Sequence, residues 1–187
     1  MSLADVTALV LAGGASRRFG SDKLAAPLHG TSLLDHLLTS FPQVWPVIVV
    51  GARRETARRV QWAREDPPGG GPLAGVAAGV ALVPTEIVAV VAGDMPYAGP
   101  PLVELVATLR NQPPDVAGVV ATDHAGVANP LLAAYRTAAL ARAIPTPAHG
   151  RAAKLLLGVP HTELTVHGVA GRDVDTRADL DELDLPS

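Results

Sequence analysis

The stretch VTALVLAGGASRRFGSDK, Val6 to Lys23, decides the architecture of the chain. Its first part, Val6–Leu11, is mostly apolar and shows no regular alternation of polar and apolar residues. Runs of this kind are typical of parallel strands that are buried on both faces of a sheet. We therefore predict a buried β-strand that ends in a glycine turn at Gly13 and Gly14.

Cationic side chains gather directly after this predicted strand. Gly13 and Gly14 are followed by Arg17, Arg18 and Lys23. Glycine lets the backbone take positive φ and approach a ligand, so that successive amides can surround a phosphate. Arginine and lysine nearby can neutralise its charge. The cluster therefore predicts an anion-binding loop for phosphate groups, and a tight turn with solvated cations is the structural alternative.

Similar apolar runs recur along the chain and alternate with segments of helical periodicity. The further predicted strands are Pro46–Val50, Ile87–Ala92 and Val116–Thr122. The predicted helices are Ser32–Phe41, Arg53–Trp62, Leu73–Val83 and Pro100–Arg110. Strand–helix–strand units of this kind are right-handed and build a parallel sheet that is covered by helices. We expect a Rossmann-like, three-layer α/β/α fold with a mainly parallel sheet, formed as a single domain over residues 1–187.

The pattern is less regular after Ala128. The runs NPLLAAYR and HTELTVH predict two more strands, the second at an edge of the sheet because it alternates. Short helices are predicted at Thr137–Ile144, Gly150–Leu157 and Thr176–Leu183.

The composition limits the class of protein. With 187 residues, of which 48% are hydrophobic, the chain can bury a substantial core. A net charge of −3 gives no bulk attraction to nucleic acid, and the absence of cysteine excludes disulfides, thiolate metal sites and a cysteine nucleophile. No membrane-spanning run or signal peptide is recognisable in the sequence. We therefore expect a cytoplasmic protein with no nucleic-acid or membrane partner.

Carboxylates occur where a metal ion could face the predicted phosphate loop. Asp94 closely follows the strand Ile87–Ala92 and should lie at the carboxyl edge of the sheet, where open parallel sheets bind their ligands. Mg²⁺ takes one or two carboxylates together with phosphate oxygens, so a second acid is expected. Asp173 and Asp175 are the candidates, since their spacing places both on one face of an extended segment. The alternatives are capping roles, for Asp94 in a turn and for Asp175 at the last helix.

A second glycine-rich segment, EDPPGGGPLAG, extends from Glu65 to Gly75. Pro72 suits the first turn of a helix, and Gly75 permits close approach of another group. The amides of this segment could hold a base or a ribose, and a plain loop is the alternative.

Common phosphate, metal and hydrolase motifs do not fit the chain. Gly13 is followed by Gly14 and Ala15, which breaks the dinucleotide fingerprint, and Gly20 is followed by Ser21-Asp22-Lys23, which breaks the P-loop. The histidines form no zinc-binding spacing, and no nucleophile elbow is present. The predicted phosphate loop therefore belongs to another class.

The motif LAGGASRRFGSDK resembles the signature L-A-G-G-x-S-x-R-x-G-x-D-K of GT-A-like nucleotidyltransferases, and in particular the MobA-like group of molybdenum cofactor guanylyltransferases. The segments DPPGGGPLAG, GDMPY, NPLLAAYR and DVDTRADL appear in the order found in that family, so the resemblance covers nearly the whole chain. The chain departs from the family at Gly51, where an asparagine is usual, and in the late motif, where Asp173 and Asp175 replace an Asn-x-Asn pair.

The resemblance implies a role for each matched residue. A nucleotide loop would comprise Leu11, Ala12, Gly13 and Gly14, and phosphate contacts would come from Arg18 and Lys23. Asp66 and the loop residues Gly71, Pro72, Leu73 and Gly75 would meet guanine or ribose. Mg²⁺ would be held by Asp94 with Asp173 or Asp175, and Asn129 would lie near the acceptor. Arg17 occupies a variable position of the signature and receives no role.

The activity implied by the resemblance is magnesium-dependent transfer of GMP from GTP to the terminal phosphate of molybdopterin or molybdenum cofactor, with release of pyrophosphate. Molybdoenzymes or cofactor-delivery proteins are the implied protein partners. Two alternatives stay open at this point. One is a related nucleotidyltransferase that uses CTP or a sugar-phosphate acceptor, and the other is a nucleotide-binding regulator without catalysis.

Overall fold

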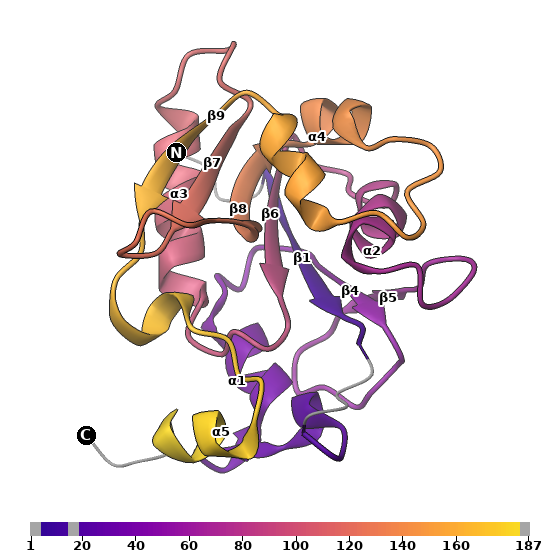
Figure 1. Cartoon of the computed structure of the whole chain (residues 1–187), viewed down its shortest axis with the longest axis vertical. Helices are drawn as coiled ribbons and strands as arrows, with labels where there is room; N and C mark the ends of the chain where they lie inside the picture. Colours follow the sequence, from indigo (N-terminus) through magenta and orange to yellow (C-terminus); the bar gives the residue numbers. More distant parts are fainter. Residues whose placement is uncertain (1–4, 15–18, 184–187) are drawn as a thin grey trace.

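The structure, a computed structural model, describes residues 5–14 and 19–183. One large sheet runs through the molecule and carries helices on both faces (Figure 1). Its strands are β1 (Val6–Ala12), β4 (Val47–Gly51), β5 (Gln61–Ala63), β6 (Ile87–Ala92), β7 (Gly118–Thr122), β8 (Ala128–Arg136) and β9 (His161–Thr165). A small hairpin of β2 (Pro27–Leu28) and β3 (Thr31–Ser32) stands apart from it.

Helices follow several of these strands along the chain. They are α1 (Leu33–Ser40), α2 (Pro72–Val80), α3 (Gly99–Arg110), α4 (Thr137–Ala143) and α5 (Arg177–Leu183). Three short 3₁₀ turns complete the described part of the chain, namely η1 (Lys23–Ala25), η2 (Ala153–Gly158) and η3 (Gly168–Gly171). None of the described helices is long and apolar enough to cross a bilayer.

The strand order in the large sheet is β5-β4-β1-β6-β8-β7-β9. Strand β1 is parallel to β4 and β6, β4 is parallel to β5, and β7 is parallel to β9. Only β8 runs against its neighbours β6 and β7. The expectation of a mainly parallel sheet is therefore confirmed, and the strands other than β8 end at one common edge.

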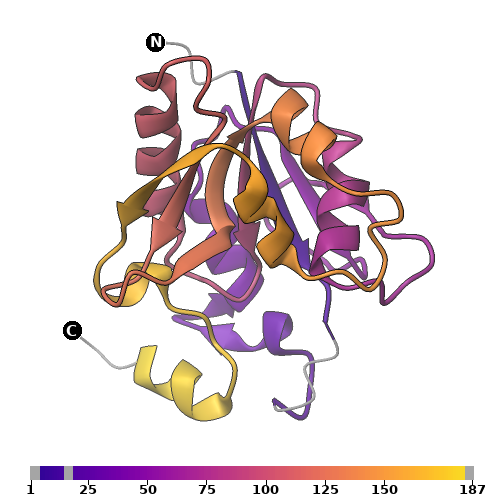
Figure 2. The same cartoon turned by 45° about the horizontal axis from the view of Figure 1, so that its top comes forward.

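Two apolar cores cover the two faces of the sheet. In β1 the side chains of Val6, Ala8 and Val10 enter one core, while Leu9 enters the other, as strand alternation requires. The leucines of α1 and α3 complete the first core, and Leu73, Val76 and Val80 of α2 with Leu140 of α4 complete the second. Figure 2 shows α3 on one side of the sheet and α2 with α4 on the other. The predicted three-layer arrangement is confirmed.

The segment between β4 and β5 is not the helix that we predicted for Arg53–Trp62. Residues 53–60 form neither helix nor strand, with a bend at Ala57 and Arg58, and Gln61–Ala63 is the edge strand β5, paired in parallel with β4. The segment has no apolar stripe at helical spacing, so a helix here would have nothing to bury. Instead Arg58 turns inward, and its guanidinium donates to the carbonyl oxygens of Leu38, Phe41, Pro42, Gln43 and Trp45.

Other predicted elements differ less. The predicted helix Gly150–Leu157 is reduced to the 3₁₀ turn η2, and β7 begins at Gly118 instead of Val116. Helix α1 begins as expected, because Ser32 caps it by accepting a hydrogen bond from the Asp35 amide at 3.0 Å.

Gly51, where the resembling family has asparagine, closes β4 against the end of β1. Its φ is +151°, and a Cβ at this position would lie 2.6 Å from the Ala12 carbonyl oxygen. The close approach of two backbones therefore explains the glycine. It also brings the chain after β4 directly against the chain that leaves β1.

We predict that Arg58→Ala destabilises the fold by about 2 kcal/mol or more, because it removes a charged donor from several carbonyl groups after α1. Urea unfolding followed by circular dichroism measures the effect. Arg59→Ala removes the same charge from an exposed neighbour and should change the free energy of unfolding by less than about 0.5 kcal/mol. Equal effects of the two substitutions would contradict the role given to Arg58.

We also predict that Gly51→Ala lowers the free energy of unfolding by about 1–3 kcal/mol, because the added Cβ overlaps the Ala12 carbonyl and the backbone is strained for any L residue. Thermal and urea unfolding provide the measurement. Gly13→Ala is the matched control for stability, since a Cβ there meets no atom of the part of the chain that the structure describes within 4 Å. A stable Gly51→Ala variant would show that the contact between β1 and β4 can relax.

Candidate functional site

Two cavities open at the edge of the sheet where the parallel strands end. The first, which we name the strand-end cavity, has a volume of about 450 Å³ and receives residues from the ends of β1, β4 and β6. Its lining consists of Leu11, Gly13, Gly14, Val50, Glu65, Gly69, Gly71, Pro72, Gly75, Ala92, Asp94 and Leu131. Open parallel sheets bind ligands at this edge, so the cavity has the position of a binding site.

Glycines of the strand-end cavity leave room for a ligand at the loop after β1. A Cβ at Gly13 or Gly14 would meet no other atom of residues 5–14 and 19–183 within 4 Å, so packing against these residues does not explain the glycines. Gly14 has a φ of +130°, which favours glycine for a conformational reason, whereas Gly13 has no such constraint. The open space above both residues fits the close approach of an anion to their amides.

The loop before α2 forms the opposite wall. Gly71 has a φ of +85° and precedes the helix, whose first residue is Pro72. A Cβ at Gly75 would lie 3.4 Å from Leu11 Cδ2, so this helix packs closely against the end of β1. The two glycine-rich segments quoted from the sequence therefore face one cavity.

Lys23 lies between acidic groups from two distant segments. Its Nζ donates to Asp94 Oδ2 at 2.7 Å, to Asp175 Oδ1 at 3.3 Å and to the Val174 carbonyl oxygen at 2.7 Å. We name Lys23, Asp94 and Asp175 the Lys23 cluster. Its lysine side chain is 14% exposed and Asp94 is 23% exposed, so the charges are partly shielded from solvent.

The charges of the cluster are coupled. Burial by itself lowers the pKa of Lys23, but hydrogen bonding and charge attraction from Asp94 and then Asp175 outweigh it and raise the pKa above its ordinary value. Lys23 therefore keeps its positive charge at neutral pH. The site holds one cation against two carboxylates before any ligand is considered.

The structure separates the alternatives for the late acidic residues. Thr176 Oγ1 accepts from the Asp179 amide at 3.2 Å, and Asp179 Oδ2 accepts from the Thr176 amide at 2.7 Å. Thr176 and Asp179 thus cap α5 reciprocally, as in a capping box. Asp175 is turned toward Lys23 instead.

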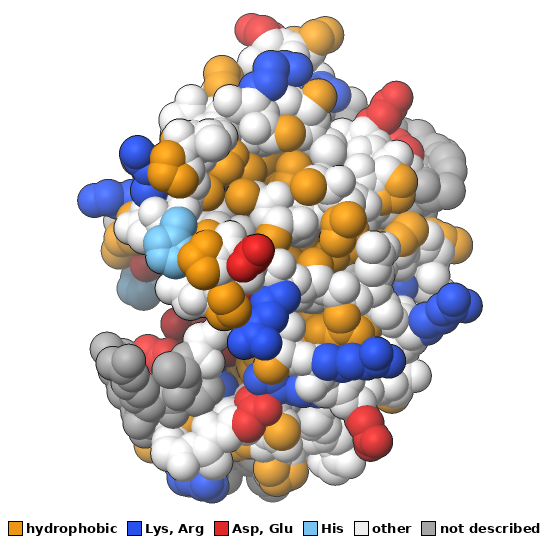
Figure 3. All heavy atoms as spheres, turned by 90° about the vertical axis from the view of Figure 1, so that its right-hand side faces the viewer, with side chains coloured by type: hydrophobic (Ala, Val, Ile, Leu, Met, Phe, Trp, Pro, Cys, Tyr) orange, Lys and Arg blue, Asp and Glu red, His pale blue; other side chains and the backbone are white. Residues whose placement is uncertain are grey.

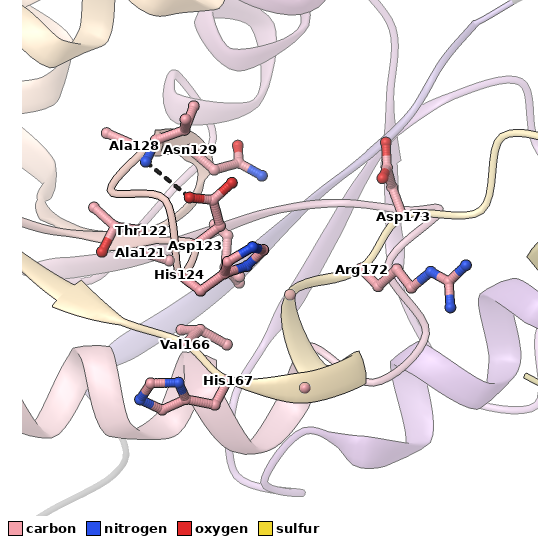
Figure 4. A pocket seen from close by; sticks show the side chains of 14 residues that line it. Ala121, Thr122, Asp123, His124, Ala128, Asn129, Val166, His167, Arg172 and Asp173 are labelled. Atoms are coloured by element: carbon pink, nitrogen blue, oxygen red, sulfur yellow. Dashed lines mark hydrogen bonds between the residues drawn. The ribbon is translucent and has the colours of Figure 1, made fainter.

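A second cavity, which we name the Asn129 cavity, lies where β7 ends and β8 begins. It has a volume of about 670 Å³ and includes Asn129 and Asp173 in its wall. Figure 4 shows their side chains with those of His124, His167 and Arg172 around the same space. The wall of this cavity therefore carries imidazole, amide and carboxylate groups, whereas the Arg172 guanidinium donates to Glu182.

The wall between the two cavities is a short piece of β8. Asn129 Oδ1 accepts from the Leu131 amide at 3.0 Å, and Leu131 lines the strand-end cavity. The pairing with β7 shifts between Val120 and Ala121, which is the kind of irregularity that re-aims side chains beside active sites. Asn129 Nδ2 also approaches Met95 Sδ at 3.9 Å, one residue beyond Asp94.

Asp66 does not line the strand-end cavity. It is exposed and borders another hollow of about 690 Å³ together with residues of α2 and of the segment 144–149. Hydrophobic side chains interspersed with Lys and Arg are visible on this face of the molecule (Figure 3). The neighbouring residue Glu65 lines the strand-end cavity instead, with Oε1 accepting from the Gly69 amide at 3.0 Å.

Most other predicted site residues gather at this edge of the sheet. The strand-end cavity includes Leu11, Gly13, Gly14, Gly71, Pro72, Gly75 and Asp94. Ala12 and Leu73 are buried in the neighbouring elements and do not line it. Arg18, and with it Arg17, lies outside the described residues.

Several residues of these cavities were missed from the sequence. They are Glu65, Leu131, His124, His167 and Arg172. Glu65 is the first residue of the quoted segment EDPPGGGPLAG, and Arg172 lies directly before Asp173, so proximity to a motif was the available signal for these two. The histidines come from separate loops, and no spacing in the sequence relates them.

The donor set of the Lys23 cluster fits a divalent cation that also binds phosphate. Among the described residues, no group of three or more His, Asp or Glu side chains forms a closed metal site. Asp94 and Asp175 nevertheless converge on one cationic group. Mg²⁺ needs no more than such a pair, since it takes its other ligands from water and phosphate.

The sequence matches a family model described as the MobA-like NTP transferase domain over residues 8–162. Among similar curated proteins, the molybdenum cofactor guanylyltransferase of Vibrio cholerae is 35% identical over 97 residues, which are 49% of this chain and 48% of that protein. A probable molybdenum cofactor guanylyltransferase of Natronomonas pharaonis is 35% identical over 101 residues, which are 49% of this chain and 50% of that protein. The chain thus spans about half the length of these relatives in the matched regions.

Solved structures share the fold along nearly the whole chain. Molybdopterin-guanine dinucleotide biosynthesis protein A from Archaeoglobus fulgidus superposes with a TM-score of 0.71 at 20% identity, covering 95% of this chain and 96% of that one. A nucleotidyl transferase from Methanothermobacter gives a TM-score of 0.75 at 18% identity, with 96% and 95% covered. The 2-C-methyl-D-erythritol 4-phosphate cytidylyltransferase from Thermus thermophilus gives 0.69 at 17% identity, with 94% and 96% covered.

These structural likenesses show a common α/β fold, and the family match extends from the first strand of the sheet into the last. It includes the glycine loop after β1, the loop before α2, Asp94 and Asn129. The chain belongs to the family of MobA-like NTP transferase domains.

Proposed function

We propose that this chain transfers GMP from GTP to the terminal phosphate of molybdopterin or molybdenum cofactor and releases pyrophosphate. We further propose that residues 1–187 act in this reaction as one nucleotidyltransferase domain. Membership of the family supports a nucleotidyl-transfer reaction, and the names of the curated relatives support GTP and the pterin acceptor.

One observation carries the proposal. The Lys23 cluster stands at the strand-end cavity, whose walls come from two glycine-rich loops. A nucleoside triphosphate needs a site with close backbone approach and a balance of cationic and metal-binding groups. The cluster and the loops supply both at one edge of the sheet.

The proposed mechanism depends on charge and alignment. A phosphate acceptor is anionic at neutral pH, so its oxygen can attack the α-phosphorus of GTP without a strong general base. In our proposal the Gly13 and Gly14 amides hold the triphosphate, and Lys23 neutralises charge on the transferring and leaving phosphates. Arg18 is proposed for the same task from its place in the signature.

Asp94 and Asp175 would hold Mg²⁺, with Asp173 nearby on the wall of the Asn129 cavity. A bound Mg²⁺ would supply Lewis-acid stabilisation of phosphate oxygens. We assign the acceptor to the Asn129 cavity, which adjoins the strand-end cavity through the Asn129–Leu131 segment. The amide of Asn129 would orient the acceptor beside the nucleotide.

We predict that GTP with Mg²⁺ raises the melting temperature of the protein more than CTP, ATP or UTP does. At equal concentration, the nucleotide that binds the folded state more tightly stabilises it more. Thermal-shift curves over a range of nucleotide concentrations measure this preference. A larger shift with CTP would favour a cytidylyltransferase. Shifts with nucleotide but no pyrophosphate release with any acceptor would favour a regulator without catalysis.

We predict that Asp94→Asn and Lys23→Ala each lower magnesium-dependent pyrophosphate release by about 100-fold or more, because the first removes a carboxylate that would hold Mg²⁺ and the second removes a cation that neutralises phosphate charge. The matched controls are Asp115→Asn and Lys154→Ala, which alter exposed residues away from the cluster. Circular dichroism checks that the variants are folded. Turnover like that of the controls would rule out the assigned roles.

A further inference from the structure

Arg54 joins three segments next to the proposed phosphate site, although no motif of the sequence includes it. Its Nε donates to Asp22 Oδ2 at 2.7 Å, and its Nη2 donates to Asp22 Oδ1 at 3.0 Å. Its Nη1 donates to the carbonyl oxygens of Ala52 at 2.9 Å and Ala12 at 3.3 Å. One guanidinium therefore ties the chain after β4 to the end of β1 and to the turn that precedes Lys23.

Asp22 connects Arg54 to the turn that carries Lys23. Its side chain caps the 3₁₀ turn η1 by accepting from the Leu24 amide at 3.3 Å, and Lys23 is the first residue of that turn. The hydrogen bonds and the charge of Arg54 lower the pKa of Asp22, so its carboxylate stays ionised as a partner. Lys23 then extends from the fixed turn to Asp94 and Asp175.

We propose that Arg54 is a positioning residue for nucleotidyl transfer, which holds Asp22 and the end of β1 so that Lys23 faces the reacting phosphates. This inference rests on the function proposed above, and it adds a residue to which neither the motifs nor the family match gives a role. Arg54 acts through Asp22 and Lys23 and touches no reacting atom.

The chemistry of the contact explains why arginine occupies this position. Two parallel hydrogen bonds to one carboxylate need a planar fork, and the guanidinium still has donors left for two carbonyl oxygens. A lysine in the same place could supply the charge but not this geometry. The Asp22 side chain is 44% exposed, and pairs with such exposure contribute little to the stability of a whole domain. The effect of Arg54 should therefore appear in the placement of the η1 turn and in turnover, with little change in melting temperature.

A double-mutant cycle with Lys23 tests the proposal through turnover. We expect Arg54→Gln to lower kcat for pyrophosphate release by about 10-fold, which is less than the roughly 100-fold that a 1 Å misplacement of a catalytic group can cost, with a smaller change in KM for the nucleotide. In a Lys23→Ala background the same substitution should change kcat by less than about twofold, since its effect passes through Lys23. Asp22→Asn should reproduce the loss, and Arg54→Lys should recover little of it.

The matched control is Arg53→Gln, which removes the same charge from an exposed neighbour and should leave kcat within about twofold of the wild type. Independent, multiplicative losses for Arg54→Gln and Lys23→Ala would overturn the proposal and indicate that Arg54 contacts substrate directly. An Arg54→Gln variant as active as Arg53→Gln would also overturn it.

Hydrogen exchange gives a readout that does not depend on activity. In Arg54→Gln, and not in Arg53→Gln, the amides of residues 22–26 should exchange faster, because Asp22 loses the partner that fixes the cap of η1. Unchanged exchange would overturn the positioning role. If the wild type neither binds a nucleoside triphosphate nor releases pyrophosphate, the proposed function fails. The exchange result then still decides whether Arg54 positions this turn.

Discussion

The site depends on the hydrogen bonds and ion pairs that the ammonium group of Lys23 makes. This group joins the turn after β1 to Asp94 after β6 and to the segment at Val174 and Asp175. These contacts span 71, 151 and 152 residues of sequence, so they connect segments that only the folded sheet brings together. A partly buried charge requires compensation, and here that requirement fixes the relative position of three chain segments.

The direction of the strands determines how the site is divided. Because β1, β4 and β6 end at one edge, their following loops can share the strand-end cavity. Strand β8 runs the opposite way, so its beginning, with Asn129 and Leu131, lies at this same edge. One reversed strand thus provides the wall between two cavities, and in the proposed reaction the nucleotide and the acceptor would approach each other from its two sides.

Much of the fold could be predicted from the sequence because burial leaves a direct signal in it. The apolar runs of β1, β6 and α1 were recognisable since each of them lies within a core. The segment after β4 gave a wrong prediction because the decisive group there is Arg58, whose side chain binds backbone carbonyls that no pattern identifies. The reason for glycine at position 51 is likewise visible only in the folded structure, where the Ala12 carbonyl leaves no room for a Cβ.

The glycine and acid motifs were expected to gather at one edge of the sheet, and the structure places them there because loops at the ends of neighbouring parallel strands meet. The sequence could not show that Glu65, and not Asp66, lines the strand-end cavity. The two acids are adjacent, and the local backbone conformation decides which of them faces the cavity. It also could not show the Val174 carbonyl as a partner of Lys23, since every residue carries such a group. The Arg54–Asp22 ion pair could not be predicted either, because its two residues are 32 positions apart and no sequence pattern relates them.

The segment from Arg172 to Thr176 has a consequence for how fold and site are distributed along the chain. The sheet is complete once β9 ends at Thr165, and this later segment adds no strand to it. Yet it supplies two of the groups that receive hydrogen bonds from Lys23. Part of the charge balance of the site, the Asp175 carboxylate, is therefore encoded after the last strand, so that a substitution late in the sequence can change the charge of the site while the sheet is preserved.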